Sequence, residues 1–181
     1  YGNQFILGFK NIPLVSSNIE FKETNIIPKI KIKQFKDGLK VAVMAVSDPK
    51  LFYDLKKQAD IEIEDPRNAI KVMLPKLRHS ENPDLVILLS HMPRESALKL
   101  MKIDGIDIFI NGHIETDTDT IDMEPVQAGD RIFVQPGPKG QKMGELRITI
   151  DSQGHKTYQQ KMVKLDSSFK NDGEMVKLYE E

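Results

Sequence analysis

Cysteine and tryptophan are both absent from the 181 residues of this sequence. Without cysteine, the chain can form no disulfide and no thiolate metal site, and it cannot use a thiol nucleophile. No apolar run reaches the roughly 18 residues that a membrane-spanning helix needs, so no transmembrane segment is predicted. An excess of basic charge is also lacking, because 26 Lys and Arg face 27 Asp and Glu, for a net charge of −1. That balance argues against nucleic acid as a partner bound through a broad basic face.

What is present is typical of a globular α/β domain. The apolar fraction of 39% and the charged fraction of 29% are ordinary, and the length fits one domain. Apolar stretches of strand character alternate with segments of helical period. We predict strands at residues 14–19, 30–35, 39–47, 85–89, 106–110, 131–135, 144–150 and 156–163. We predict helices at residues 50–59, from 65 onward, at 94–102 and at 174–179.

The order of these elements predicts a layered fold with mixed strand pairing. Strand–helix–strand units early in the chain favour parallel strands, whereas the last three strands are typical of an antiparallel meander. The apolar run at 39–47 is typical of a strand covered on both faces. Asp65 and Pro66 predict a helix start, because an Asp N-cap with proline in the first helical position is a favoured pair. Pro75 predicts a kink or an early end of that helix.

Two of the four histidines directly follow apolar strands. His91 comes after the strand at 85–89, and His113 comes shortly after the strand at 106–110. Ligands of open α/β sheets bind beyond the carboxyl ends of the strands, where two imidazoles can converge on one point. Imidazole binds Zn, Mn, Fe and related ions, Glu115 offers a carboxylate nearby, and Gly112 would allow close approach of the backbone. The pattern predicts a metal site, although each histidine alone also fits a polar strand cap.

The remaining candidates have simpler explanations. His79 follows the end of a predicted helix, and His155 lies in a turn beside Gly154, so we expect both to be solvated. Ser90 is adjacent to His91 in a strand, so their side chains should point to opposite faces. That orientation argues against a Ser–His catalytic pair.

Several segments resemble motifs of the calcineurin-like metallophosphoesterases. Leu85–Met92 (LVILLSHM) resembles their fourth motif, and Ile106–Glu115 (IDIFINGHIE) resembles their Gly-His-x-His motif. Pro13–Asn18 (PLVSSN) and Pro125–Leu146 (PVQAGDRIFVQPGPKGQKMGEL) are similar to the branch that contains 5′-nucleotidases and 2′,3′-cyclic-nucleotide phosphodiesterases. The resemblance covers nearly the whole chain.

The resemblance implies an α/β fold in which a metallophosphoesterase-type mixed β-sandwich is flanked by helices. It implies a hydrolase that uses two divalent metal ions (Mn, Zn, Fe or Co) to act on nucleotides or related small phosphoesters. His91 and His113 would each bind a metal, and Glu115 falls where the family has His or Gln. A carboxylate there would change the metal preference. The branch is commonly extracytoplasmic, which implies a periplasmic or secreted protein.

The family's Asp-x-His motif, its bridging Asp and its Asn-His motif should precede Pro13, and this chain does not contain them. The chain also begins at Tyr1 rather than Met. We therefore expect residues 1–165 to be the second half of a metallophosphoesterase domain, with its N-terminal part missing. Residues 166–181 would be a polar tail or the start of a linker. Such a chain would be inactive alone, would hold few or no metal ions, and would need the N-terminal half or a second copy as partner.

Two alternatives remain open at this point. The chain could be a non-catalytic binding or assembly module on the same scaffold. It could also hold a mononuclear site built from His91, His113, Glu115 and a water, since three protein ligands plus water is a known catalytic zinc arrangement.

Overall fold

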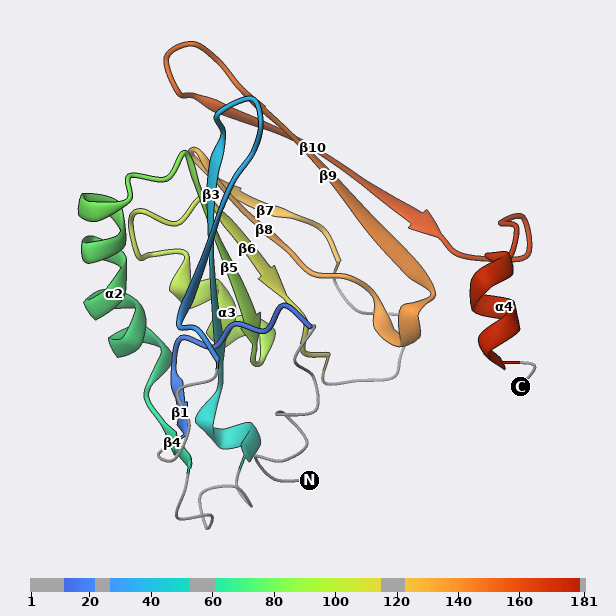
Figure 1. Cartoon of the computed structure of the whole chain (residues 1–181), viewed down its shortest axis with the longest axis horizontal. Helices are drawn as coiled ribbons and strands as arrows, with labels where there is room; N and C mark the ends of the chain where they lie inside the picture. The colour runs from blue at the N-terminus through green and yellow to red at the C-terminus, as the bar shows by residue number, and fades with distance from the viewer. Residues whose placement is uncertain (1–11, 22–26, 53–60, 115–122, 180–181) are drawn as a thin grey trace.

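A computed structural model describes residues 12–21, 27–52, 61–114 and 123–179. Within these residues a six-stranded sheet forms the centre, in the order β2-β3-β5-β6-β8-β7 (Figure 1). Its strands are β2 (Ile30–Gln34), β3 (Lys40–Ser47), β5 (Leu85–His91), β6 (Ile108–Asn111), β8 (Arg131–Val134) and β7 (Val126–Ala128). The four central strands are parallel, and β2 and β7 pair antiparallel at the edges. The predicted mixed α/β fold is confirmed.

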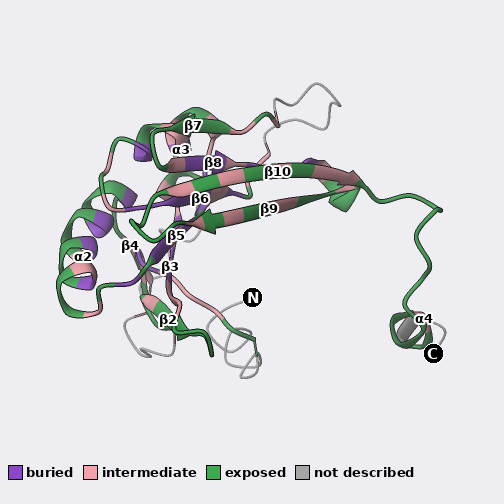
Figure 2. Ribbon diagram, turned by 90° about the horizontal axis from the view of Figure 1, so that it is seen from above, coloured by how far each residue is buried: buried purple, intermediate pink, exposed green. Residues whose placement is uncertain are grey.

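One face of this sheet is covered by α2 (Pro66–Ser80) and α3 (Arg94–Leu100) (Figure 2). The apolar stripe of each helix packs on alternate residues of the strands, because strand side chains alternate between faces. The buried core of this layer consists of Ala42, Met44, Val46, Ile70, Leu74, Leu77, Val86, Leu88, Met92, Ala97, Leu100, Met101, Ile106, Phe109 and Phe133.

The start of α2 follows its sequence signals, and the predicted early end at Pro75 is wrong. The carboxylate of Asp65 accepts hydrogen bonds from the backbone N–H groups of Arg67 and Asn68, at 2.9 and 3.1 Å. The helix then continues through Pro75 to Ser80. Pro75 lies on the exposed side, where water can bond the carbonyl that loses its N–H partner.

The other face is covered only in part, by the hairpin of β9 (Lys142–Ile150) and β10 (Lys156–Lys164). Leu146, Ile148 and Tyr158 pack there with the buried residues Leu85 and Ile108. The predicted meander is therefore wrong in one respect, because β8 joins the main sheet beside β6 and does not pair with β9.

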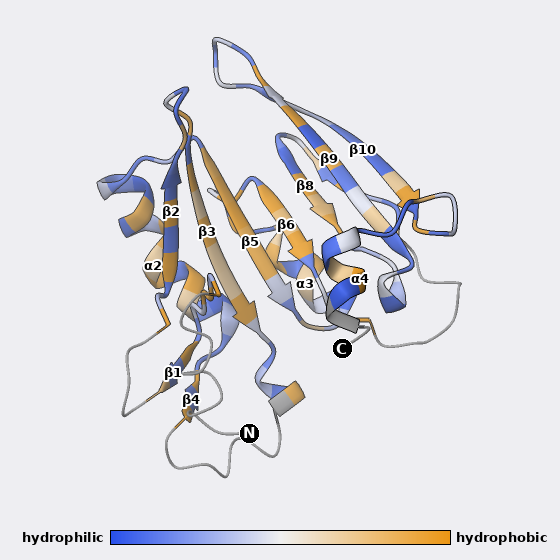
Figure 3. Ribbon diagram, turned by 45° about the vertical axis from the view of Figure 1, so that its right-hand side comes forward, coloured by the Kyte–Doolittle hydropathy of each residue, from blue (hydrophilic) through white to orange (hydrophobic). Residues whose placement is uncertain are grey.

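Some apolar side chains on this second face of the sheet are not covered by the β9–β10 hairpin. Figure 3 shows β3 and β5 as apolar strands, with β6 and β8 between them and the hairpin. Val43 and Ala45 are half-buried there, and Leu89 is 36% exposed. The strand predicted to be covered on both faces is thus fully covered on the helix face alone. The described part of the chain forms one complete layer of packing and one incomplete layer.

The first strand prediction is also wrong. Strand β1 (Ile19–Phe21) begins where the predicted strand ends, and it pairs with β4 (Ile61–Ile63), which the sequence did not indicate. In the segment before β1, hydrogen bonds from the buried side chain of Ser17 hold the backbone, and no strand ladder forms. Ser17 donates to the Lys29 carbonyl at 2.6 Å and accepts from the Ala45 N–H at 3.0 Å.

The short helices complete the description. A 3₁₀ turn, η1 (Pro49–Phe52), occupies the start of the helix predicted at 50–59, whose remainder lies outside the described residues. A second 3₁₀ turn, η3 (Pro138–Gly140), precedes β9, and α4 (Gly173–Tyr179) confirms the last predicted helix. Figures 1 and 2 show α4 apart from the sheet layers. None of the helices described here is both long and apolar enough to cross a membrane.

Candidate metal centre

The parallel strands β5 and β6 bring the two predicted histidines to one edge of the sheet. His91 is the last residue of β5, and the register that pairs Ser90 with Asn111 places the His113 segment directly beside it. The backbone N–H of Gly112 donates to the Ser90 carbonyl at 2.8 Å, which continues the ladder past the end of β6. The edge is the carboxyl end of the parallel strands, as predicted.

The imidazoles of His91 and His113 are neighbours. Their ring centroids lie 4.8 Å apart, with an angle of 75° between the ring planes. His91 is exposed and His113 is half-buried, so solvent reaches the pair. Two adjacent imidazoles can supply two ligands to a borderline-soft divalent ion, so the donor set fits part of a metal site.

The glycine between the strand and His113 has a smaller role than we predicted. A Cβ built on Gly112 would lie 3.9 Å from the Ser90 carbonyl oxygen and 4.0 Å from Nδ1 of His91. These are ordinary contact distances, so the close approach of the two segments does not depend on glycine at this position.

The environment of His91 favours its neutral form. Although the residue is exposed overall, its imidazole is partly desolvated, and this burial is the larger cause that lowers its pKa below the ordinary 6.5. Repulsion from the neighbouring His113 lowers the pKa of His91 further. Only the neutral imidazole offers a lone pair to a metal ion, so both effects keep His91 ready to bind one.

Replacing His113 with Gln should raise the pKa of His91. The substitution removes the positive charge that His113 can carry, while the Gln side chain still shields most of the His91 ring from solvent. The pKa should stay below 6.5, since desolvation is the larger cause. Protonation of His91 is disfavoured in the folded state. The neutral His91 ring therefore contributes its full share of the folding stability above the unfolded-state pKa of about 6.5. That contribution is lost as pH falls through the lower folded-state pKa.

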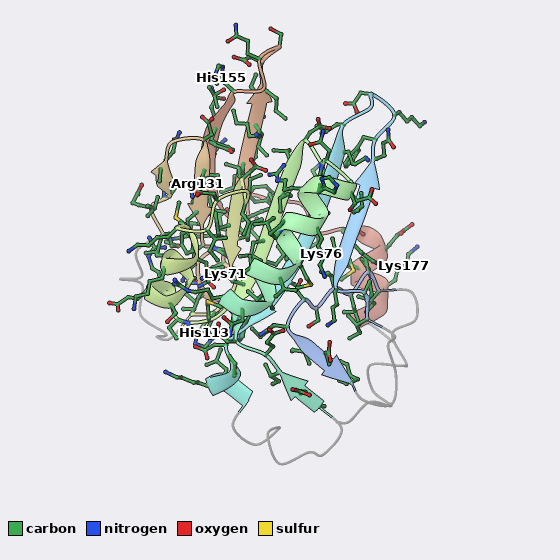
Figure 4. The ribbon with its side chains drawn as sticks, turned by 90° about the vertical axis from the view of Figure 1, so that its left-hand side faces the viewer. Lys71, Lys76, His113, Arg131, His155 and Lys177 are labelled. Carbon is green, nitrogen blue, oxygen red and sulfur yellow. The ribbon has the colours of Figure 1, made fainter. Side chains whose placement is uncertain are left out.

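Titration of the histidine rings by NMR measures this shift. His155→Gln is the control, because His155 is exposed and lies at the far end of the hairpin from His113 (Figure 4). An unchanged His91 midpoint in the His113 variant would contradict the electrostatic coupling of the two rings.

The other candidate residues are placed as follows. Glu115 lies outside the described residues, so its predicted role as third ligand stays a prediction. Among the residues that are described, no group of three or more His, Asp or Glu side chains could hold a metal ion. His79 and His155 are exposed, which confirms the prediction of solvated side chains. Ser90 is only 6% exposed and points away from His91, as expected for neighbours in a strand.

Sequence reasoning missed two buried amides beneath the histidines. Asn111 at the end of β6 has 0% exposure, and Gln135 after β8 has 3%. Ser90 donates to the side-chain oxygen of Asn111 at 2.9 Å, so the network also reaches β5. The sequence did offer one sign of this network. Ser90, Asn111 and Gln135 are polar residues that each stand at the end of an apolar strand.

No family model matches the sequence, and no curated protein sequence matches it. Solved structures do match, over nearly the whole chain. A calcineurin-like phosphoesterase from Bacillus subtilis superimposes with a TM-score of 0.73 at 19% identity, over 98% of this chain. The fold is that of a calcineurin-like phosphoesterase. An NAD nucleotidase from Haemophilus influenzae (TM-score 0.74, 17% identity, 97% of this chain) agrees with this result. So does a 5′-nucleotidase precursor from Thermus thermophilus (TM-score 0.72, 18% identity, 90% of this chain).

The structural likeness confirms the resemblance that the sequence motifs indicated. At these identities it establishes the calcineurin-like phosphoesterase scaffold and leaves the activity to be tested. The chain spans 64% of the length of the Bacillus protein, 37% of the Haemophilus protein and 35% of the Thermus protein.

Proposed function

We propose that this chain is part of a dinuclear-metal phosphoester hydrolase that acts on nucleotides or related small phosphoesters. The observation that carries the proposal is the pair of adjacent histidines at the carboxyl edge of a calcineurin-like phosphoesterase scaffold, 4.8 Å apart between ring centroids. Three of the matching solved structures carry the names phosphoesterase, NAD nucleotidase and 5′-nucleotidase. Phosphoester hydrolysis is the chemistry that these names share.

His91 and His113 would hold divalent ions such as Mn, Zn, Fe or Co, with Glu115 as a further ligand. Two such ions would supply the positive charge that stabilises the transferred phosphoryl group. The lowered pKa of His91 favours the neutral ring, which is the form that binds a metal ion. Three protein ligands are too few to hold two ions, so the remaining ligands would come from outside the residues named here.

The incomplete second layer supports a partner for this chain. Leu89 is 36% exposed on the open face, and a cavity of about 230 Å³ lies between the sheet and the hairpin. Ile110, Val134 and Leu146 line that cavity. Within the described residues, β9 and β10 pair only with each other, and an isolated two-stranded ribbon is marginally stable. Further strands packed here would complete a β-sandwich.

We propose that the N-terminal half of the same domain is this partner, and that residues 1–165 form the second half. The alternative occupant is a second copy of the chain. Residues 166–181 would form a tail or the start of a linker, which is supported by the position of α4 apart from the sheet layers. We further propose an extracytoplasmic location, supported by the precursor form of the Thermus nucleotidase.

A second candidate function is a non-catalytic binding or assembly module. The observation that favours it is Glu115, which stands where the family that the sequence resembles has His or Gln. The two functions differ in their dependence on His91 and His113, since a binding module does not need either imidazole.

The test is to express the intact protein that contains this chain and to measure its metal content and its hydrolysis of nucleotides. We expect about two divalent ions per chain and hydrolysis of phosphoesters with Mn, Zn or Co. His91→Ala and His113→Ala should each reduce the metal content and lower the rate by more than the roughly 10- to 100-fold that loss of an outer-shell partner costs at metal sites. His155→Ala is the matched control, because that histidine is exposed and remote from the pair. A metal-free protein whose properties are unchanged by both site variants would overturn the proposal in favour of the binding module.

A further inference from the structure

A single buried amide connects the two strand ends that carry the histidines. The side-chain N–H₂ of Asn111 donates to the carbonyl of Met92, the residue after His91, at 3.0 Å. The same group lies 3.4 Å from the carbonyl of His113. Asn111 is therefore bonded to the main chain beside one histidine and to the main chain of the other.

Gln135 adds a second tie from the next strand. Its side-chain N–H₂ donates to the His113 carbonyl at 3.2 Å, while its side-chain oxygen accepts from Asn111 at 3.1 Å. Ser90 donates to the side-chain oxygen of Asn111 at 2.9 Å, which fixes how the Asn111 amide is turned. The three side chains form a continuous network across the ends of β5, β6 and β8.

This network is buried, so its hydrogen bonds are costly to lose. Asn111 has 0% exposure, Gln135 has 3% and Ser90 has 6%. A buried amide left without its partner keeps the full cost of its desolvation, about 1–3 kcal/mol. The network therefore holds the backbone of His113 in one position relative to the backbone after His91.

We propose that Asn111 and Gln135 are positioning residues that hold the His91 and His113 rings beside one another for a shared ligand. The proposal rests on the proposed function only for the ligand, which is a divalent metal ion. The ring geometry itself can be tested without metal. Outer-shell groups of this kind change metal affinity by about 10- to 100-fold when they are removed.

A purely structural role predicts a different result. If the amides served only to satisfy buried polar groups, their loss would lower stability and leave the histidine pair unchanged. A control that removes one side-chain hydrogen bond elsewhere in the fold separates the two cases. Tyr158→Phe provides it, because the Tyr158 hydroxyl donates to the Asp130 carbonyl at 2.7 Å, in the turn that precedes β8 and thus at the opposite end of that strand from Gln135.

The experiment compares Gln135→Met with Tyr158→Phe in the intact protein that contains this chain. Methionine keeps the shape of glutamine and removes its donor. In the metal-free protein, with labelled histidine, we expect the nuclear Overhauser contact between the His91 and His113 rings to weaken or vanish in Gln135→Met. The contact should persist in Tyr158→Phe. Titration with Co²⁺ alone, followed by its visible absorption, should show an affinity about 10- to 100-fold weaker in Gln135→Met only.

Ser90→Ala is a milder second variant that keeps both amides and removes only the bond that orients Asn111. It should give a smaller loss in the same direction, and it serves if Gln135→Met does not fold. An unchanged ring contact in the variants, or equal Co²⁺ losses in the variants and in Tyr158→Phe, would overturn the inference. If the wild-type protein binds no Co²⁺ but the ring contact still depends on Gln135, the positioning role stands and the proposed metal function fails.

Discussion

Replacing Asp107 with Ala should lower the free energy of unfolding by about 3–5 kcal/mol, because it leaves cationic groups without their buried partner. Asp107 is 7% exposed and lies just before β6. Its carboxylate accepts from Arg78 of α2 at 2.8 Å, from the Val86 N–H of β5 at 2.7 Å and from Lys156 of β10 at 3.1 Å. One side chain thus joins the helix layer, the sheet and the hairpin.

The matched control for this prediction is Asp104→Ala. Asp104 pairs with Arg131 at 3.1 Å, but the Asp104 side chain is 92% exposed. An exposed ion pair contributes less than about 1 kcal/mol, so this variant should be nearly neutral. Urea unfolding followed by circular dichroism measures both changes. Equal losses in the two variants would mean that the Asp107 carboxylate is not the tie between the layers.

Replacing Phe109 with Ala should cost about 3–5 kcal/mol of stability, since it removes a large side chain from a closed core. Phe109 is 1% exposed in the middle of β6 and belongs to the core between the sheet and its two helices. The same strand ends at Asn111, so the cavity would also loosen the support of the His113 segment. We therefore expect weaker protection of the Gly112 N–H from hydrogen exchange in this variant.

Phe35→Ala is the matched control, because it removes the same side chain at a site that is 42% exposed. The Lys33 ammonium lies 4.9 Å from the centre of that ring, a contact worth at most about 1 kcal/mol. Denaturant unfolding should therefore separate the two variants by at least roughly 2 kcal/mol. A Phe109 variant as stable as the Phe35 variant would show that the core relaxes to fill the space.

The sequence was sufficient to predict the meeting of His91 and His113. Each follows a run of apolar residues long enough to be a buried strand, and the parallel arrangement of such strands places their carboxyl ends together. The same local signals predicted the start of α2, because the Asp65 side chain bonds backbone groups only two and three residues away. Information of this kind is contained in a few consecutive residues.

The features that the sequence did not reveal depend on distant partners. Strands β4 and β7 have three residues each, too few to show an alternating pattern. Gln135 is one of many polar residues in the sequence, and its importance comes from His113, 22 residues earlier, whose carbonyl it bonds. The segment around Ser17 was wrongly predicted to be a strand, because its residues favour strands. In the structure it is held by hydrogen bonds from the Ser17 side chain to Lys29 and Ala45.

The edge strand β2 limits how copies of this chain could associate. Lys31 and Lys33 of β2 are exposed, and they pair with Val43 and Val41 of β3. Every second residue at this part of the free edge of the described sheet is therefore positively charged. A like strand from another copy would bring these charges together, which opposes edge-to-edge growth. The other edge, β7, has only three residues for a new strand to pair with. Copies that met at the open face would therefore not extend into a fibre by adding strands at the edges of the described sheet.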